Sequence, residues 1–361
     1  MKQVLSNFKI NEKILLIEPY GEGHINDTYL VTCENNKKYI LQRINNRVFK
    51  DVNGLMNNIS LVTSFLKEKI KENNGDPEKE TLNIVKTLND SPYYFDKQTK
   101  KYYRVYLFVD GSLTLQKADT KELFKESAIA FGRFQKLLSA FDASLLCETI
   151  INFHNTKERY NHFVNTLSLD KCNRSKYCKE EIEFVLKRKD YCSKIVDLIE
   201  SKKIPLKVTH NDTKLNNVLL NNETKKSLCV IDLDTIMPGS ALYDFGDSIR
   251  FGCNMGSEDS ENLDEVTFSI EYYKAFVEGF LQEVKSSLNK YELEYLSFAA
   301  ILMTLECGIR FLDDFLDGDN YFKTSKENHN LIRCRTQFKL VFEMEKQLDL
   351  MNQIVMDVYK K

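Results

Sequence analysis

The sequence predicts an α+β chain of two lobes, with antiparallel strands and one helix in the first lobe and mainly helices in the second. Strand-like segments dominate the first hundred residues, whereas apolar residues recur with helical spacing from residue 119 onwards. A chain of 361 residues is also long enough for two lobes. We expect an N-terminal lobe at residues 1–110 and a C-terminal lobe at 111–361, divided near Asp110-Gly111-Ser112.

The first lobe is expected to hold strands around a single helix. Apolar and β-branched runs bounded by turn residues predict the strands, and two of them flank Glu34–Lys37 as a hairpin. Apolar residues from Leu55 to Leu66 recur with helical spacing and predict a helix over 51–70, followed by a polar loop over 71–80. The predicted strands are 14–17, 29–33, 39–43, 93–95 and 102–108.

The second lobe is expected to be helical around a short segment of strands. Phe124, Phe131 and Leu138 share one face of a helix, and residues 157–202 read as two charged amphipathic helices. Further helices are expected around 265–289, 291–315 and 326–358. Between them lie a short strand at 204–209 and a hairpin of strands 218–220 and 228–231.

Composition excludes several classes of protein. A net charge of −2 argues against a chain that coats nucleic acid, whose phosphates demand a strong basic excess. No apolar run approaches the roughly 20 residues of a membrane helix, and the N-terminus lacks a signal-peptide core. The nine cysteines are scattered without a Cys-x-x-Cys pair, so we expect reduced thiols. The chain is expected to be cytoplasmic, a monomer or weak homodimer, without nucleic-acid or membrane partners.

The stretch from His210 to Asp232 carries the strongest functional signal. It places Asp212, then Asn217 five residues on, then Asp232 one hairpin later. Phosphoryl transfer from a nucleotide needs a carboxylate for the acceptor hydroxyl and oxygen ligands for Mg²⁺. We therefore predict Asp212 as the catalytic residue and Asn217 with Asp232 as metal ligands. A buried structural aspartate would explain one of these residues but not the ordered set.

A second acidic segment, Asp244-Phe245-Gly246, spells the metal-binding motif of protein kinases. It follows a long turn with Pro238 and Gly239 and comes too late after the hairpin, so Asp232 fits the metal position better. We expect Asp244 to be a buried carboxylate that braces the catalytic loop. Asp234 could contact a second metal or face solvent.

Three features of the first lobe suggest a nucleotide site for ATP. Gly21 and Gly23, with Asn26 close by, lie in a strand-turn-strand context where backbone can approach phosphates, although glycines are also ordinary in hairpin turns. Arg43 ends a strand where kinase-like folds put a phosphate-binding cation, or it is simply solvated. The backbone of the hinge at 107–110, at Leu107 and Val109, is expected to bind a purine through hydrogen bonds. The sequence does not tell whether that purine belongs to ATP or to GTP.

These residues resemble the aminoglycoside phosphotransferase and choline kinase superfamily, which has a protein-kinase-like fold. Its pattern is His-x-Asp-x-x-x-x-Asn followed by an Ile-Asp segment. More narrowly, the chain looks like the N-acetylhexosamine 1-kinases. The matching strings lie at 21–29, 39–45, 210–219, 231–239, 243–251 and 306–322.

The resemblance implies ATP- and Mg²⁺-dependent phosphorylation of the anomeric hydroxyl of N-acetylglucosamine or N-acetylgalactosamine. The product would be a sugar 1-phosphate for nucleotide-sugar synthesis or salvage. In that family, the positions of His24, Phe251, Arg310 and Tyr321 touch the sugar. From the residues alone, Phe251 could equally be core, and Arg310 could form an ion pair with Asp313 or Asp314.

One departure from the superfamily concerns the first helix. An acidic residue is expected there to pair with the strand-end cation, but this chain has Asn57 and Asn58, and Glu68 lies too far along. Arg43 is therefore expected to lack that partner. Two alternatives stay open: a phosphotransferase for another small-molecule hydroxyl, such as choline, thioribose or an aminoglycoside, and a catalytically weak nucleotide-binding regulator.

Overall fold

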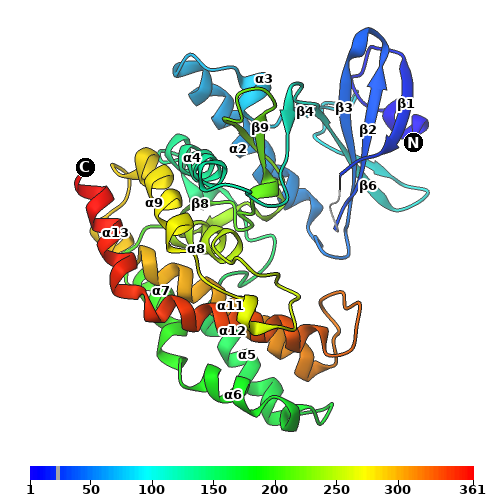
Figure 1. The fold of residues 1–361 in the computed structure, drawn as a ribbon. Helices are drawn as coiled ribbons and strands as arrows, with labels where there is room; N and C mark the ends of the chain where they lie inside the picture. Colours follow the sequence, from blue (N-terminus) through cyan, green and yellow to red (C-terminus); the bar gives the residue numbers. More distant parts are fainter. Residues whose placement is uncertain (22–24) are drawn as a thin grey trace. The chain divides into compact units, whose positions relative to one another are not determined.

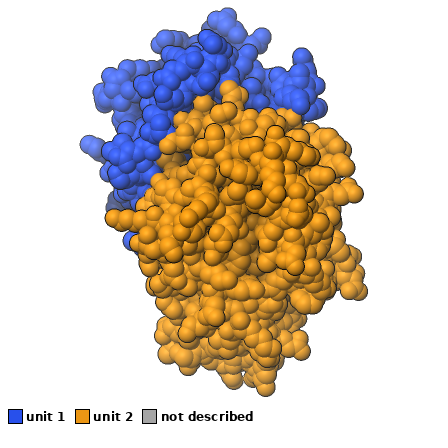
Figure 2. All heavy atoms as spheres, turned by 90° about the vertical axis from the view of Figure 1, so that its left-hand side faces the viewer, with its two compact units in different colours: residues 1–114, 140–151, 218–238 blue, residues 115–139, 152–217, 239–361 orange. Residues whose placement is uncertain are grey.

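The structure, a computed structural model, describes residues 1–21 and 25–361. These residues form two compact units, which Figure 2 distinguishes by colour. Unit 1 comprises residues 1–114, 140–151 and 218–238, and unit 2 comprises 115–139, 152–217 and 239–361. The first segment of unit 1 ends close to the predicted boundary. The two later segments of unit 1 were not anticipated, and the division into 1–110 and 111–361 stays a prediction.

Unit 1 is built on an antiparallel sheet in the order β1-β2-β3-β6-β4, with β5 paired to β6 (Figure 1). The predicted hairpin is confirmed, because β2 and β3 pair from Asp27 opposite Arg43 to Thr32 opposite Lys38. The strands are β1 (Ile14–Pro19), β2 (Asp27–Cys33), β3 (Lys38–Ile44), β4 (Ile84–Val85), β5 (Tyr94–Asp96) and β6 (Lys101–Leu107).

The two faces of this sheet differ in polarity. Alternate side chains, among them Leu41 and Val105, are buried on one face with Leu5 of α1 (Lys2–Leu5) and with Phe8. Side chains alternate across a strand, so Gln42 and Arg104 lie on the opposite face. That second face carries the polar contacts described below.

The rest of unit 1 consists of α2, a second small sheet and short turns. Asp51 caps α2 (Val52–Glu72) by accepting from the backbone N–H of Gly54. The predicted loop over 71–80 is wrong at its end, because Asp76 caps a single helical turn, α3 (Pro77–Glu80), that opens with a proline. The other elements are η1 (Glu34–Asn36), β7 (Ser112–Leu113), η2 (Ala143–Leu145), β9 (Val218–Asn221), β10 (Ser227–Val230), η5 (Leu233–Thr235) and β11 (Met237–Gly239), whose last residue lies in unit 2.

Unit 2 is mainly helical, which confirms the predicted fold class. The described helices are α4 (Lys121–Leu137), α5 (Thr156–Leu169), α6 (Lys179–Leu186), α7 (Lys189–Glu200), α8 (Ala241–Gly252), α9 (Ile270–Val284), α10 (Lys290–Glu294), α11 (Leu296–Asp317), α12 (His329–Lys346) and α13 (Leu348–Lys360). Strand β8 (Lys207–Thr209) and the short turns η3 (Ser175–Tyr177), η4 (Leu215–Asn217) and η6 (Leu263–Glu265) complete it.

Three helix predictions need correction. Residues 157–202 form three helices rather than two. Asp170 takes a left-handed conformation that ends α5, and its carboxylate accepts from Arg174 and Ser175. A second break, at Lys187 and Arg188, separates α6 from α7. The segments predicted as 291–315 and 326–358 each break into two helices, at Tyr295 and Gln347. Helix α8 was not predicted at all.

Helix α11 is the centre of the core of unit 2. It packs against α5, α8 and α12, and its residues are buried on nearly all sides. At the crossing with α8, a Cβ placed on Gly246 would lie 2.4 Å from the carbonyl oxygen of Ala299. Only glycine permits this close approach, so the glycine of the kinase-like triplet serves helix packing here. None of the helices in the described part of the chain has the length and apolarity needed to cross a membrane.

Candidate functional site

The candidate catalytic loop, residues 210–217, follows strand β8 in unit 2. The side chain of Asp212 is 30% exposed, and its Oδ1 lies 3.0 Å from Nζ of Lys214. Asn217 donates from Nδ2 to the Asp212 carbonyl at 2.8 Å and to Oδ2 at 3.2 Å. The Asp212 carboxylate raises the pKa of Lys214. Asp212 is thus an accessible carboxylate, held between a cation and an amide.

Helix α8 braces this loop through Asp244, as predicted. Asp244 is 1% exposed and accepts from the backbone N–H groups of His210 at 3.0 Å and Asn211 at 2.8 Å. Gln135 of α4 donates to the same carboxylate at 2.6 Å. Burial raises the pKa of Asp244, while His210 and these donors oppose the rise. Ser240 caps the start of α8, where its side chain accepts from the backbone N–H of Leu242.

Asp247 and Ser248 extend the bracing and were missed in the sequence. Asp247 accepts from the backbone N–H of Thr213 at 3.0 Å, and Ser248 donates to the Thr213 carbonyl at 3.1 Å. Burial disfavours the charge of Asp247, but Arg250 and Lys214 outweigh it and lower its pKa. The spacing of Asp244, Asp247 and Ser248 along an apolar segment was the available signal, because it places them on one helical face.

The peptide bond between Asn211 and Asp212 contacts two histidines. Its carbonyl accepts from Nε2 of His154 at 3.2 Å, and its N–H donates to Nδ1 of His210 at 3.3 Å. Asn211 has φ +64°, a left-handed conformation that asparagine tolerates better than most residues. The other ring nitrogen of His154 lies 2.8 Å from Oε1 of Glu306 in α11. Sequence reasoning assigned no role to His154 or to Glu306, although Glu306 is the first residue of the 306–322 string.

Of the residues predicted to touch a sugar, the three that the structure describes lie on or near α8 and α11. Phe251 is half-buried and packs against the core, while Tyr321 is 67% exposed. The guanidinium of Arg310 is half-buried and lies over the rings of Phe153, Tyr321 and Phe322, at 5.4, 5.9 and 5.5 Å from their centroids.

Arg310 does not form the ion pair considered as an alternative. Asp313 pairs with His162, and Asp314 accepts from the backbone of Tyr321 and Phe322 and from Asn330. Within the residues that the structure describes, no carboxylate pairs with Arg310. Its N–H groups are therefore available to a ligand.

In unit 1, Asp232 follows the predicted hairpin, which is confirmed. Val218, the residue after Asn217, pairs with Val230, two residues before Asp232. Asp232 is exposed and has φ +57°, in the left-handed region that aspartate tolerates. It starts the turn η5, which carries Asp234.

A buried polar cluster surrounds Asp234 and excludes one of the two options left open for it. Its Oδ1 pairs with Nη1 of Arg104 at 2.5 Å, and both side chains are at most 5% exposed. Asn26 donates to its other oxygen at 2.6 Å, and Arg104 also donates to Gln42 at 2.9 Å. Asp234 therefore does not face solvent. Sequence reasoning missed Arg104, although its place on a strand between apolar neighbours was a signal.

The predicted phosphate cation, Arg43, pairs with Asp27 on the adjacent strand. Of Asn57 and Asn58, which stand in the region where an acidic residue was expected, Asn58 is fully buried in α2. Its Nδ2 donates to the carbonyls of Cys147 at 2.8 Å and Ile236 at 2.9 Å, and its Oδ1 accepts from the Cys147 N–H. Asn58 thus fixes the backbone after Asp234 instead of pairing with a cation.

The remaining nucleotide predictions fall partly on described residues. Gly21 has φ +76°, which favours glycine, whereas Gly23 and His24 lie outside the described residues. At the hinge, the N–H of Leu107 donates to Asn83, and the carbonyl of Val109 accepts from Ser112. The role of the hinge stays a prediction.

The donors of the predicted metal ligands suit Mg²⁺. In the described part of the chain, no three His, Cys, Asp or Glu side chains gather as a metal cage. Mg²⁺ does not need one, because it usually binds one or two protein oxygens and takes phosphates and water as its other ligands. Asn217 turns its Nδ2 to Asp212, which leaves its Oδ1 for another partner. The residues present therefore fit the ion.

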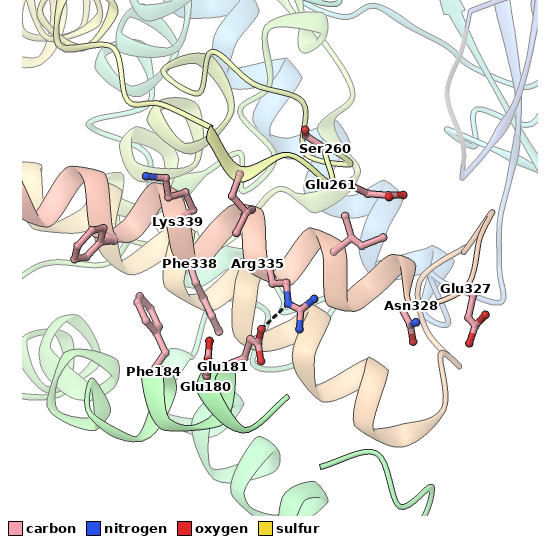
Figure 3. Close-up of a pocket in the computed structure, with 13 residues that line it drawn as sticks. Glu180, Glu181, Phe184, Ser260, Glu261, Glu327, Asn328, Arg335, Phe338 and Lys339 are labelled. Atoms are coloured by element: carbon pink, nitrogen blue, oxygen red, sulfur yellow. Dashed lines mark hydrogen bonds and ion pairs between the residues drawn. The ribbon is translucent and has the colours of Figure 1, made fainter. Parts of the chain in front are cut away.

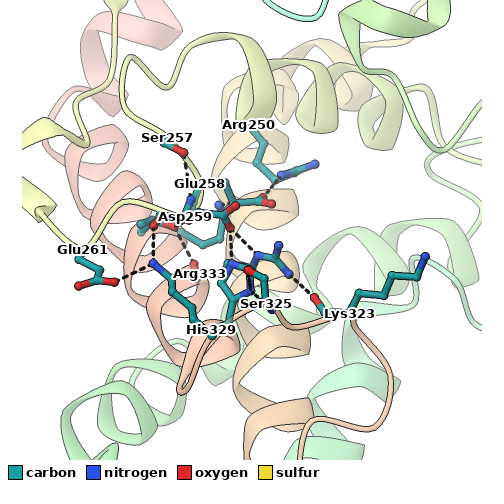
Figure 4. Close-up of polar contacts among 12 residues, drawn as sticks. Arg250, Ser257, Glu258, Asp259, Glu261, Lys323, Ser325, His329 and Arg333 are labelled. Carbon is teal, nitrogen blue, oxygen red and sulfur yellow. Dashed lines mark hydrogen bonds and ion pairs between the residues drawn. The ribbon is translucent and has the colours of Figure 1, made fainter. Parts of the chain in front are cut away.

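A large groove in unit 2 lies between α6 and α12, and no residue of the catalytic loop lines it. It has a volume of about 900 Å³ and mixes phenylalanines with charged residues, of which Glu181 and Arg335 pair with each other (Figure 3). Nearby, Asp259 accepts from His329 at 2.9 Å and Arg333 at 2.6 Å (Figure 4). These contacts hold the segment before η6 onto α12.

Comparison with known proteins identifies a family. The model described as "Phosphotransferase enzyme family" matches residues 16–268. This range covers most of the chain and includes the catalytic loop, the hairpin and α8.

Solved structures share the fold. A microcompartment-associated aminopropanol kinase is 13% identical, with a TM-score of 0.61 and coverage of 97% of each chain. An aminoglycoside phosphotransferase from Alicyclobacillus acidocaldarius is 12% identical, with a TM-score of 0.64 and coverage of 99% of this chain and 96% of the other. An amicoumacin kinase in complex with AMP-PNP, Ca²⁺ and Ami is 14% identical, with a TM-score of 0.57 and coverage of 95% and 92%.

Proposed function

The chain belongs to the phosphotransferase enzyme family, and on that premise we propose that it is an ATP- and Mg²⁺-dependent kinase of a small-molecule hydroxyl. The observation that carries the proposal is the accessible carboxylate of Asp212, on a loop whose backbone is hydrogen-bonded to Asp244 of α8. A reacting carboxylate must be exposed to substrate yet fixed in position, and this arrangement meets both requirements.

In the proposed reaction, Asp212 orients the acceptor hydroxyl and accepts its proton. The hydroxyl oxygen forms a bond to the γ-phosphorus of ATP, the bond to the bridging oxygen breaks, and ADP leaves. The loose transition state demands positioning and charge stabilisation more than a strong base. Lys214, whose Nζ lies 3.0 Å from Oδ1 of Asp212, places a positive charge beside the developing negative charge.

The proposed ligands of Mg²⁺ are Asn217 and Asp232. When bound, the ion would neutralise charge on the β- and γ-phosphates. Support comes from their oxygen donors and from the amicoumacin kinase, whose complex contains AMP-PNP and Ca²⁺. In unit 1, Arg104 and Asn26 would hold Asp234, and through it the turn that starts at Asp232.

The proposed substrate is an N-acetylhexosamine, phosphorylated at its anomeric hydroxyl. Arg310 supports this choice, because a guanidinium without an ion pair suits neutral, acceptor-rich ligands and repels cationic amino alcohols. The exposed ring of Tyr321 beside it could cover an apolar face of a sugar. The resemblance of residues 306–322 to the N-acetylhexosamine 1-kinases points to the same class. His24 and Phe251 remain proposed sugar contacts.

A substrate panel tests the proposal. The protein is incubated with Mg-ATP and N-acetylglucosamine, N-acetylgalactosamine, choline, thioribose or an aminoglycoside, and ³¹P NMR identifies the product. We expect an anomeric sugar phosphate, and turnover of choline or the aminoglycoside alone would refute the sugar assignment. Asp212→Asn should lower kcat by about 10³-fold or more with nucleotide still bound. No turnover of any substrate, together with tight ATP binding, would favour the regulator alternative.

A further inference from the structure

His154 and Glu306 form a buried pair that the sequence did not predict. The side chains are 7% and 1% exposed, and the pair joins residues 152 positions apart in the sequence. The ring of His154 packs between Phe153 and Tyr243, with centroids at 4.5 and 5.5 Å. Thr156 donates to the second oxygen of Glu306 at 2.5 Å. Every polar atom of the pair therefore has a partner.

Both ring nitrogens of His154 face hydrogen-bond acceptors. Nδ1 lies beside the Glu306 carboxylate and Nε2 beside the Asn211 carbonyl, so a ring with two N–H groups would satisfy both contacts. Burial disfavours the charge of Glu306, but His154 and Thr156 outweigh it and lower its pKa. His329 provides a contrast, since one ring nitrogen faces the N–H of Ser325 and the other faces Asp259. A neutral ring satisfies those two contacts.

We propose that His154, held as an imidazolium by Glu306, is a positioning residue that fixes the carbonyl of Asn211 and so the peptide that presents Asp212. The inference rests on the proposed function, because it assigns His154 a role in the step that Asp212 performs. His210 holds the N–H of the same peptide, and Asp244 holds the N–H of Asn211. Replacing His154 removes its hydrogen bond to the Asn211 carbonyl, while the hydrogen bonds of the two neighbouring N–H groups remain.

The surroundings of the pair are charged on several sides. The titratable and charged groups that act on it are Asp247 and Tyr243 from α8, Arg159 from α5, Cys192 from α7 and Arg310 from α11. Arg310 lies one helical turn after Glu306 on α11. The helix that offers a guanidinium to the substrate therefore also anchors the catalytic loop.

The kinetic test compares His154→Leu with His162→Leu. His162 is a matched control, because it likewise pairs with a carboxylate of α11, Asp313, at 2.7 Å, but it lies on α5 and is 66% exposed, whereas His154 precedes that helix and is buried. We expect His154→Leu to lower kcat by about 10- to 100-fold with little change in the KM for ATP, and His162→Leu to leave both unchanged.

Two further variants keep the test decisive if His154→Leu alone fails to fold. His154→Leu combined with Glu306→Met leaves no unpaired buried charge, and it should show the same loss of kcat. Glu306→Gln should retain kcat, because the amide can donate to Nδ1 of a neutral ring whose Nε2–H still reaches Asn211.

An NMR measurement tests the inference without turnover. The chain has five histidines, so ¹⁵N labelling of histidine gives a simple spectrum. At pH 7.5, His154 should show two protonated ring nitrogens, His329 one, and Glu306→Gln should change His154 to one. A neutral His154 in the wild type, or a folded His154→Leu with the kcat of His162→Leu, would overturn the inference. A wild type that phosphorylates nothing in the panel refutes the proposed function and leaves the NMR result to decide the role of the pair.

Discussion

Replacing Asp244 with asparagine is expected to damage both the stability of unit 2 and catalysis. The carboxylate accepts two donors on Oδ2, from His210 and Gln135, and one on Oδ1, from Asn211. An asparagine can place its oxygen at the Oδ2 position, but its amide then faces the N–H of Asn211. A donor is left facing a donor in a site that is 1% exposed.

The size of the effect follows from these contacts. One buried N–H without an acceptor costs about 1–3 kcal/mol. The two remaining hydrogen bonds lose their charge assistance, roughly 1 kcal/mol each, which brings the total to about 3–5 kcal/mol. For a unit of this size, that loss corresponds to a drop in Tm on the order of 10 °C. Displacement of the loop that carries Asp212 should also lower kcat by up to about 100-fold.

Thermal unfolding and coupled ADP-release kinetics measure the two effects. Asp264→Asn is a matched control, because Asp264 is exposed and the same atoms change. The control should keep the wild-type Tm and kcat. If Asp244→Asn behaves like Asp264→Asn in both measurements, Asp244 does not brace the loop and the reasoning is wrong.

Three other changes have defined outcomes. Gly246→Ala should lower the unfolding free energy by about 1–3 kcal/mol, measured by thermal melts, because its Cβ would meet the Ala299 carbonyl 2.4 Å away; an unchanged Tm would contradict the close crossing. Arg104→Gln should cost about 3–5 kcal/mol and weaken ATP binding in calorimetry, since Asp234 would keep a buried charge without its cation; full affinity and stability would exclude that role. Folding lowers the pKa of Glu306, so the ionised carboxylate stabilises the folded protein at any pH above the pKa that Glu306 has in the unfolded chain, and this stabilisation is lost as the pH falls through the folded pKa. Glu306→Gln should therefore flatten the fall of Tm below about pH 5. An equal fall of Tm in the variant and the wild type would refute this role of Glu306.

Most of the fold was accessible from local patterns. Strand alternation predicted the β2–β3 hairpin, and helical spacing predicted α2 and α4. The pattern failed where a break is decided by backbone conformation, as at Asp170, whose left-handed φ ends α5. It also failed for α8, whose Gly246 and two aspartates do not look helical until the neighbouring α11 and the catalytic loop give them partners.

The sequence by itself determined the candidate chemistry, because the order of Asp212, Asn217 and Asp232 depends on short spacings along one segment. Only the tertiary structure showed how that segment is held. The pairing of His154 with Glu306 joins residues far apart in the chain, and the burial of Arg104 against Asp234 joins a strand to a distant turn. Such contacts arise from packing between elements that are distant in the sequence, and the local periodicity of apolar residues does not reveal them. The same physics determined that Asn58 holds backbone where an acidic residue was expected.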